Sequence, residues 1–394
     1  AQMRVLQAFM RRAIAGTLKV EADVLSIITF RMKQSLRVAD FHGVANWLAL
    51  YDYFSVPQPA APQAEANLHT DLETDLGKAI ASLSSYIERC RWFFVLAPSV
   101  LHEEGHLIDY NSWKSRGWCR FERLARVLSP ARDTNVLLIK DDRAVFQAVP
   151  HQWFSEPLGD GFFTVESDRA RLATKLADML QKKLQYLSES GSVSEHRRWL
   201  ASFSSLFSGL PVARRSARSI EYMGGCRGSE VEDFLIAHRF CSATDTPHGT
   251  SALHIAAAEG NAQVIESLLA SRASVNRGER TASPAFCVHV GMRPLHFAAM
   301  YGHVAAVSVL IQQGADVNAR TRNADPPLNF AVLSSNLEVH LELIRSRADL
   351  SSRTIFGTTV LEVAVVYHKI DVVRFLLSTD VPRDCNEHGV NALH

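Results

Sequence analysis

The sequence lacks an excess of either charge. Its 42 lysines and arginines are matched by 41 aspartates and glutamates, which gives a formal net charge of +1. A protein that binds nucleic acid or an anionic membrane through its overall field needs a strong basic excess. We therefore expect no nucleic-acid partner.

Long apolar runs, paired cysteines and phosphate-binding glycine loops are also missing. No stretch reaches the roughly 18 uncharged apolar residues that a membrane span requires, and the first residues have no apolar signal-peptide core. The six cysteines lie far apart and form no CxxC pair, so we expect neither a disulfide framework nor a cysteine zinc site. Together these absences predict a soluble, cytoplasmic protein with no bound cofactor.

The start of the chain leaves one alternative for location. Arg4, Arg11, Arg12 and Lys19 all precede the first acidic residue, Glu21. This pattern fits either a mitochondrial transit peptide or an ordinary basic amphipathic helix. Because the chain also opens without Met and closes within a repeated motif, we treat it as a possible fragment.

A short motif recurs in the second half of the chain. Its copies are residues 249–254, 291–296, 324–329, 357–362 and 389–394. After a longer first interval, the copies follow one another at a nearly constant spacing. That spacing is about 33 residues, which is the length of an ankyrin repeat.

The residues after the motif also resemble the ankyrin family. Residues 256–261 and 298–303 each contain a pair of small alanines, which lets two helices approach closely, and Gly302 can turn the chain between them. Gly314 then suits the end of a second helix. The resemblance implies an all-α solenoid over residues 229–394 whose job is to bind another protein. It would comprise a capping half-repeat around residues 231–236, four units and a truncated fifth.

Two of the units depart from the family pattern Thr-Pro-Leu-His. The third has Pro-Pro-Leu-Asn at residues 326–329, and the fourth has Thr-Val-Leu-Glu at residues 359–362. The Thr and His of the pattern form local hydrogen bonds worth about 1 kcal/mol each. We therefore expect the third and fourth repeats to be softer than the first two.

Several arginines fall in or beside the loops that project from the expected repeats. The first interval between motifs is longer than the others, which places an insertion around residues 279–289. The arginines are Arg277, Arg280, Arg293, Arg320, Arg322 and Arg353, facing Glu279 and Asp325. They predict a binding face for an acidic protein partner, although solvated loop charges explain them as well.

Residues 1–187 alternate strand-like and helix-like runs, which predicts an α/β domain. We expect strands at residues 47–54, 91–98 and 135–139, and helices at residues 76–88, 113–127 and 169–187. Residues 188–228 are rich in Ser and Arg, and we expect a helical or irregular linker there.

This order of elements resembles TIR domains and the related HET domains. The resemblance rests on a strand that contains Asp52, on the strand at residues 93–98, and on a motif formed by Ser115, Trp118, Cys119 and Glu122. It implies a parallel sheet with flanking helices. The first strand of the family, with its polar loop, is not found in the sequence.

The resemblance implies two functions. In catalytic TIR domains the Glu at the position of Glu122 assists cleavage of the nicotinamide–ribose bond of NAD, which would then be the substrate. Other TIR-like domains only self-associate. The simplest alternative makes Trp118 and Cys119 core residues, with Glu122 a surface carboxylate or an ion-pair partner of a nearby arginine.

The sequence His102-Glu103-Glu104-Gly105-His106 formally matches the zinc-protease motif HExxH. That chemistry needs both histidines on one helix, and Gly105 weakens a helix by about 1 kcal/mol. Although Glu122 is a conceivable third ligand, we expect a polar loop and no metal. The leading prediction is thus a two-domain interaction scaffold, and the alternative is an NAD-cleaving enzyme targeted by its ankyrin stack.

Overall fold

The structure is a computed structural model, and the chain divides into two compact units. One comprises residues 1–183 with 209–211, and the other residues 184–208 with 212–394. The structure describes residues 2–22, 36, 41, 75–130, 136–141, 144–148, 151–211, 230–246, 249–334 and 336–379. The predicted strand at residues 47–54, with Asp52, and the predicted fifth motif at residues 389–394 lie outside the described residues.

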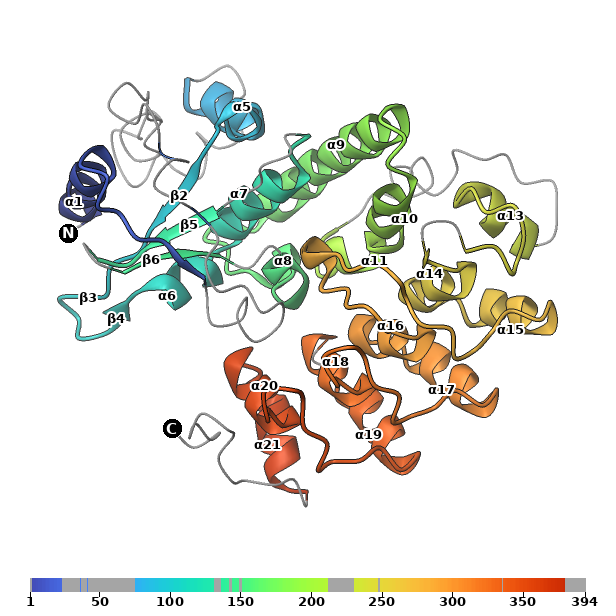
Figure 1. Cartoon of the computed structure of the whole chain (residues 1–394). Coiled ribbons are helices and arrows are strands. Elements are labelled where there is room, and N and C mark those ends of the chain that lie inside the picture. Colours follow the sequence, from blue (N-terminus) through green and yellow to red (C-terminus); the bar gives the residue numbers. More distant parts are fainter. Residues whose placement is uncertain are drawn as a thin grey trace. The chain divides into compact units, whose positions relative to one another are not determined.

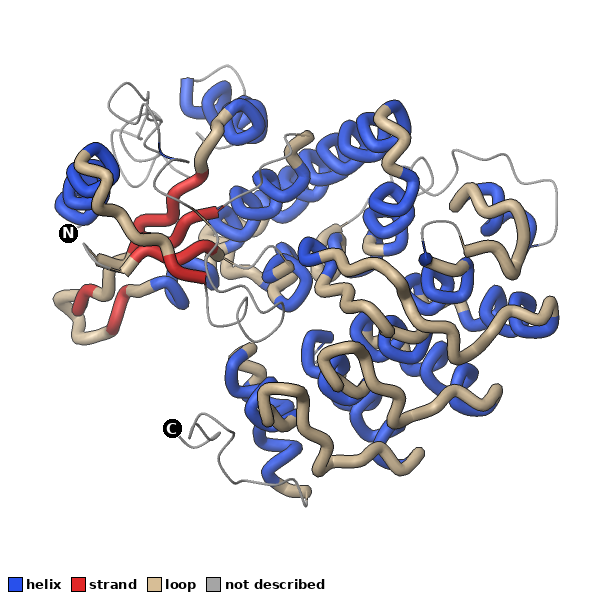
Figure 2. The backbone as a smooth tube through the Cα atoms, in the orientation of Figure 1, coloured by secondary structure: helices blue, strands red, loops and turns tan. Residues whose placement is uncertain are grey.

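The first unit contains a four-stranded mixed sheet (Figure 2). Its strands follow the order β1 (Glu21–Ala22), β6 (Val145–Gln147), β5 (Val136–Ile139) and β2 (Phe93–Leu96). β2 and β5 are parallel, as are β1 and β6, but β5 and β6 are antiparallel. A second, two-stranded sheet is formed by β3 (Val100–Leu101) and β4 (Leu107–Ile108).

The prediction of a parallel sheet is therefore wrong for its centre. β5 and β6 are joined by a short turn in which the N–H of Lys140 donates to the carbonyl of Ala144 at 3.0 Å. The N–H of Ala144 in turn donates to Oδ1 of Asp141 at 2.7 Å. A link this short reverses the chain, because a parallel connection needs a crossover of about a dozen residues.

Helices surround this sheet (Figure 1). They are α1 (Gln2–Ile14), α5 (Asp75–Arg89), α6 (Tyr110–Ser115), α7 (Gly117–Leu128), α8 (Gln152–Ser155), η4 (Leu158–Asp160) and α9 (Ser167–Glu189). The predicted helix at residues 113–127 is interrupted at Arg116, whose backbone is extended at φ −81° and ψ 135°. The other two predicted helices and the strands β2 and β5 are confirmed.

The sheet is apolar on both faces. Leu137 and Ile139 of β5 pack in one core cluster, with Phe9 of α1. Leu138, which points the other way, packs in a second cluster with Val95 of β2. A strand buried on both faces is continuously apolar, as this one is. The amphipathic first helix therefore contributes to the core of this unit.

The second unit is a row of helix pairs. They are α14 (Ala252–Glu259), α15 (Ala262–Ala270), α16 (Pro294–Tyr301), α17 (Val304–Gln312), α18 (Pro327–Ser334), α19 (Leu337–Arg345), α20 (Val360–Val366) and α21 (Ile370–Leu377). The first helices of successive pairs contact one another, from α14 through α16 and α18 to α20. The second helices α15, α17 and α19 form a neighbouring row. The solenoid predicted from the period is confirmed for these pairs.

The stack has a buried apolar interior, and the two glycines expected at helix ends occupy those places. Leu295, Val307 and Leu310 are buried. Gly302 ends α16 in the left-handed region at φ 80°, and its N–H donates to carbonyls of the last turn. Gly314 has φ 84° after α17. Only glycine adopts this conformation without strain.

Two further helices extend both rows by one place. α10 (Val193–Ala201) contacts α14, and α13 (Glu230–Ala237) contacts α15. α10 is followed by α11 (Phe203–Leu206). The segment expected as a linker, residues 188–228, thus begins with a helix of the stack. The cap of the stack therefore consists of two helices from separate parts of the chain. α10 extends the row of first helices, and α13 extends the row of second helices.

None of the described helices combines the length and the apolar character that crossing a membrane requires.

Candidate protein-interaction surface

The motif histidines link one helix pair to the next. The N–H of Ser251 donates to Nδ1 of His254 at 3.1 Å, so the ring proton lies on Nε2, which donates to the carbonyl of Met292 at 3.1 Å. His296 repeats this pattern, accepting from the N–H of Arg293 at 3.0 Å and donating to the carbonyl of Asp325 at 3.2 Å. Burial lowers the pKa of both histidines, that of His296 to about 3. Both rings are therefore neutral near pH 7.

The motif positions of the third and fourth pairs, Asn329 and Glu362, form hydrogen bonds within their own repeats. Asn329 donates to Oδ1 of Asp325, within its own repeat, at 3.4 Å. In the fourth pair, Oε2 of Glu362 accepts from the N–H and the hydroxyl of Thr359 at 2.6 and 2.9 Å. The fourth pair thus keeps a complete capping box, contrary to the expectation that it had lost its local hydrogen bonds. In the part of the chain that the structure describes, Asn329 differs from His254 and His296 in making no hydrogen bond to the following repeat.

The insertion after the first helix pair folds back onto the stack. Residues 284–286 form the 3-10 helix η6 (Pro284–Phe286), and Ser283 pairs with Val288 across it. Phe286 is buried against Trp199 of α10, with ring centroids 4.8 Å apart. The insertion, expected as a projecting finger, therefore covers the cap helix.

Glu279 at the start of the insertion is buried, with an exposed fraction of 1%. Its carboxylate accepts from the hydroxyl of Thr250 at 2.7 Å and from the N–H of Thr281 at 3.2 Å. Its Oε2 lies 3.3 Å from Nη2 of Arg198, on α10. Burial alone would raise the pKa of Glu279, but His254 and Arg198 outweigh that effect and lower it. The interpretation of Glu279 as a loop charge opposite the arginines is therefore wrong.

The sequence matches models of one protein family over this region. The model described as ankyrin repeat matches residues 248–279. The model described as ankyrin repeats in many copies matches residues 295–340. Residues 248–340 are ankyrin repeats.

Curated proteins with similar sequence differ widely from one another. The chicken nuclear factor NF-kappa-B p105 subunit is 31% identical over 141 residues, which covers 34% of this chain and 13% of that protein. The Drosophila tyrosine-protein kinase Shark is 31% identical over 147 residues, or 36% of this chain and 15% of the kinase. Human neurogenic locus notch homolog protein 2 is 35% identical over 106 residues, which covers 26% of this chain and 4% of that protein. The chain thus spans at most 15% of the length of these relatives.

The six loop arginines predicted to bind a partner divide into two groups. Arg277, Arg293 and Arg353 are half-buried and bound within the ankyrin stack. They donate to the hydroxyl of Thr246 at 2.9 Å, the carboxylate of Asp316 at 3.0 Å and the carbonyl of Gly357 at 2.7 Å, respectively. Their guanidinium groups stabilise the loops of the repeats.

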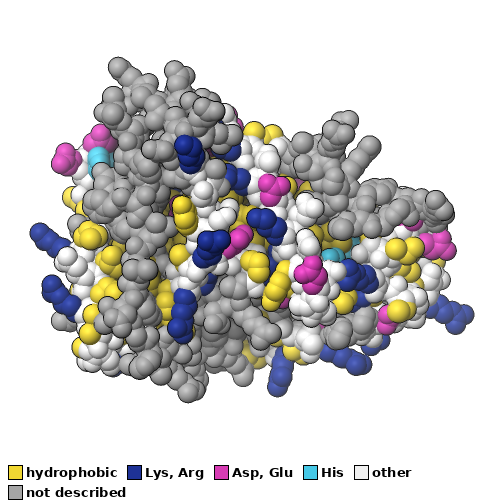
Figure 3. Space-filling view, turned by 90° about the horizontal axis from the view of Figure 1, so that it is seen from above, with side chains coloured by type: hydrophobic (Ala, Val, Ile, Leu, Met, Phe, Trp, Pro, Cys, Tyr) yellow, Lys and Arg dark blue, Asp and Glu magenta, His cyan; other side chains and the backbone are white. Residues whose placement is uncertain are grey.

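The other three loop arginines are exposed: Arg280, Arg320 and Arg322. Arg320 reaches the hydroxyl of Ser352 in the next ankyrin loop at 3.2 Å, which holds its side chain along the row of loops. On the face shown in Figure 3, the basic side chains are scattered and acidic ones stand between them. Because the net charge of the chain is only +1, the exposed loop arginines are a local feature and not part of a general basic field.

In the first unit, the residues of the TIR-like motif lie at the end of α6 and on α7, and they differ in exposure. The indole N–H of Trp118 donates to Oδ2 of Asp168 at 2.8 Å. Cys119 is buried, and Glu122 is half-buried on α7. Asp168 lies far along the chain from Trp118, at the start of α9, and no local pattern in the sequence indicated that pairing.

A second feature of α7 that sequence analysis missed is a charge cluster around Glu156. Its carboxylate lies 2.8 Å from Nζ of Lys114 and 2.9 Å from Nη1 of the buried Arg123. Burial would raise the pKa of Glu156, but the two cations outweigh it and lower the pKa. Arg126 donates to the carbonyls of Cys90 and Arg91 at 2.6 and 2.8 Å, just after α5. The arginines flanking Glu122 thus bind other parts of the unit.

Proposed function

We propose that this chain is an adaptor that binds a protein partner through its ankyrin repeats. The observation that carries the proposal is the extended row of stacked helix pairs with exposed loops, a surface that suits another protein better than a small molecule. The curated relatives share this kind of sequence while differing in everything else that their names state, which fits a binding module. A cytoplasmic location stays a prediction from composition.

The partner is proposed to be acidic and to contact the exposed loop arginines Arg280, Arg320 and Arg322. Arg320 is held in place by its bond to Ser352, so less side-chain entropy is lost when a carboxylate binds it. Charges at the rim of an interface chiefly accelerate association and make it salt-dependent.

The test is the double substitution Arg320→Glu and Arg322→Glu. We expect the free energy of unfolding to stay within about 0.5 kcal/mol of the parent because both side chains are exposed. A partner first identified by cross-linking should associate more slowly, with a flatter dependence on salt, when the kinetics are measured by biolayer interferometry.

The matched control for that test is Arg272→Glu with Arg345→Glu. Both residues are exposed, at or just beyond the ends of α15 and α19, so the total charge changes equally while the loops stay intact. Equal slowing in the two variants would contradict a specific role for the loop arginines and would indicate a nonspecific charge effect.

For the first unit we propose a structural or self-associating role without catalysis. The support is that the indole N–H of Trp118 is hydrogen-bonded to Asp168 and that Cys119 is buried. The purified chain incubated with NAD should release no more nicotinamide than a protein-free blank, measured by chromatography. Release by the wild type that disappears in Glu122→Ala would overturn this proposal in favour of the NAD-cleaving alternative. Self-association should appear as a mass that rises with concentration in light scattering.

A further inference from the structure

The segment that matches HExxH in sequence is a β-hairpin turn between β3 and β4. The N–H of His102 donates to the carbonyl of His106 at 2.8 Å, and the N–H of Gly105 donates to the carbonyl of His102 at 2.9 Å. Gly105 adopts φ +83°, which the turn requires and which glycine accepts without strain. The two histidines are therefore opposite one another at the end of a hairpin, and their side chains lie on the same face.

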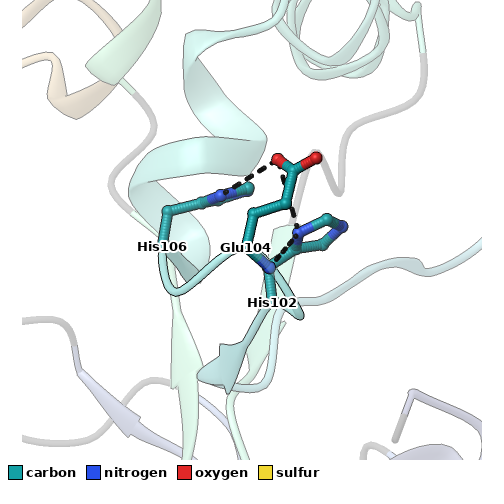
Figure 4. A group of neighbouring side chains, drawn as sticks. All are labelled: His102, Glu104 and His106. Atoms are coloured by element: carbon teal, nitrogen blue, oxygen red, sulfur yellow. Dashed lines mark hydrogen bonds and ion pairs between the residues drawn. The ribbon is translucent and has the colours of Figure 1, made fainter.

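This turn gathers three metal-binding side chains. Oε2 of Glu104 lies 3.8 Å from Nδ1 of His102 and 3.9 Å from Nδ1 of His106. The two rings are stacked with centroids 4.4 Å apart, and one potential ligand atom of each residue lies within 4.8 Å of the others. Figure 4 shows the carboxylate between the two rings.

We propose that His102, Glu104 and His106 bind a divalent transition metal ion such as Zn²⁺. Ligand atoms about 2.0 to 2.2 Å from a tetrahedral ion lie about 3.3 Å apart. The two carboxylate–imidazole distances, 3.8 and 3.9 Å, need to close by about half an ångström, and the most widely spaced pair of ligand atoms, within 4.8 Å, by up to about 1.5 Å. Two imidazoles with one carboxylate suit zinc, copper or nickel, whereas magnesium and calcium prefer oxygen ligands alone. Three protein ligands leave a coordination position open to water or to a group from another molecule.

The arrangement differs from that of a zinc protease. In HExxH enzymes the residue after the first histidine is the general base on a helix. Here the residue that joins the histidines is Glu104, the following one, and Glu103 is exposed beside the turn. The site therefore predicts metal binding, not hydrolysis, and it revises the expectation that this segment is only a polar loop. Because backbone hydrogen bonds already close the turn, little ordering is needed when the ion binds.

The experiment is calorimetric titration of the full chain with Zn²⁺ at pH 7, repeated with Mg²⁺. We expect one equivalent of Zn²⁺ to bind and no heat from Mg²⁺. His102→Ala and His106→Ala should each abolish this binding, and Glu104→Gln should weaken it. Glu103→Gln is the matched control, since it changes a neighbouring exposed carboxylate outside the cluster, and it should bind as the parent does.

Hydrogen exchange provides a second measurement that needs no substitution. Zn²⁺ should slow exchange of the amides of residues 100–108 in the wild-type chain, because the ion would join both strands of the hairpin. Absence of Zn²⁺ binding to the wild type would overturn the proposal and leave the three residues as a polar group at the turn. Binding that persists unchanged in both histidine variants, without protection of the hairpin, would overturn it equally by placing the ion elsewhere.

Discussion

The first two ankyrin repeats (α14 to α17, the front repeats) and the next two (α18 to α21, the rear repeats) have the same backbone but different hydrogen bonds. In the front repeats, His254 and His296 each cap their own helix and also bind a carbonyl of the following repeat. In the rear repeats, Asn329 donates to the side chain of Asp325 in its own repeat, and Glu362 completes the capping box of its own helix. In a stack whose stability depends on contacts between neighbours, this difference should make the front repeats the more strongly coupled half.

The largest effect should come from breaking the coupling of the cap to the front repeats. Glu279→Ala leaves Arg198 buried without its carboxylate, which should lower the free energy of unfolding by about 3 to 5 kcal/mol. Urea denaturation followed by circular dichroism would measure it. Glu266→Ala, at an exposed position of α15, is the control and should cost less than about 0.5 kcal/mol. A loss as small as that of the control would mean that Arg198 and Glu279 do not join the cap to the repeats.

Acid should weaken the front repeats before the rear ones. Buried His254 and His296 have a lowered pKa in the folded chain, as do His196 in the cap and His303 just before α17. In the rear repeats, His340 has a lowered pKa. A histidine with a lowered pKa binds its proton mainly in the unfolded chain, so its stabilising contribution is complete above about pH 6.5 and is lost as the pH falls.

Between about pH 6 and its lowered pKa, each such histidine should reduce the free energy of unfolding by of the order of 1 kcal/mol for every pH unit. Hydrogen exchange from pH 7 to pH 5, resolved by peptide, would compare the two halves. His296→Asn, which copies the residue of the third repeat, should make the front repeats less sensitive to pH. Equal loss of protection in both halves would show that the buried histidines do not control the acid response.

The smallest effect should come from giving the third repeat the histidine that it lacks. Asn329→His supplies a ring that can accept from its own helix cap and donate toward the carbonyl of Thr358, the position that matches Met292 and Asp325 in the front repeats. One added hydrogen bond between repeats should stabilise the chain by about 0.5 to 1.5 kcal/mol, seen as a higher urea midpoint. If Asn329→His destabilises the chain, the third repeat has adapted its packing to the smaller side chain.

How much of the structure could be predicted from the sequence depended on how far apart along the chain the interacting residues lie. The repeat period and its motif predicted the helix pairs and the turn at Gly302, because each repeat uses the same positions in the same way. The pairing of Arg198 with Glu279 could not be predicted, since the whole first helix pair lies between them in the chain. Trp118 with Asp168 is a similar case in the first unit.

The antiparallel pairing of β5 with β6 was missed for another reason. Apolar runs identify strands but carry no direction, and only the short turn after Lys140 decides that the chain reverses. The HExxH segment was likewise judged only by whether it could form a helix. Gly105 instead permits a hairpin, in which the carboxylate of Glu104 lies close to both histidines.

The divided cap affects the order in which the protein can fold during synthesis. α10 leaves the ribosome with Arg198 and Trp199, but their partners Glu279 and Phe286 follow only after α13, α14 and α15 have been made. At roughly 5 to 20 residues per second, α10 waits of the order of 4 to 16 seconds for the surface that covers it. During that interval an arginine and an indole destined for burial are open to chaperones and to other nascent chains. The ankyrin stack therefore becomes complete at its N-terminal end only after its first full repeat and the following insertion have been made.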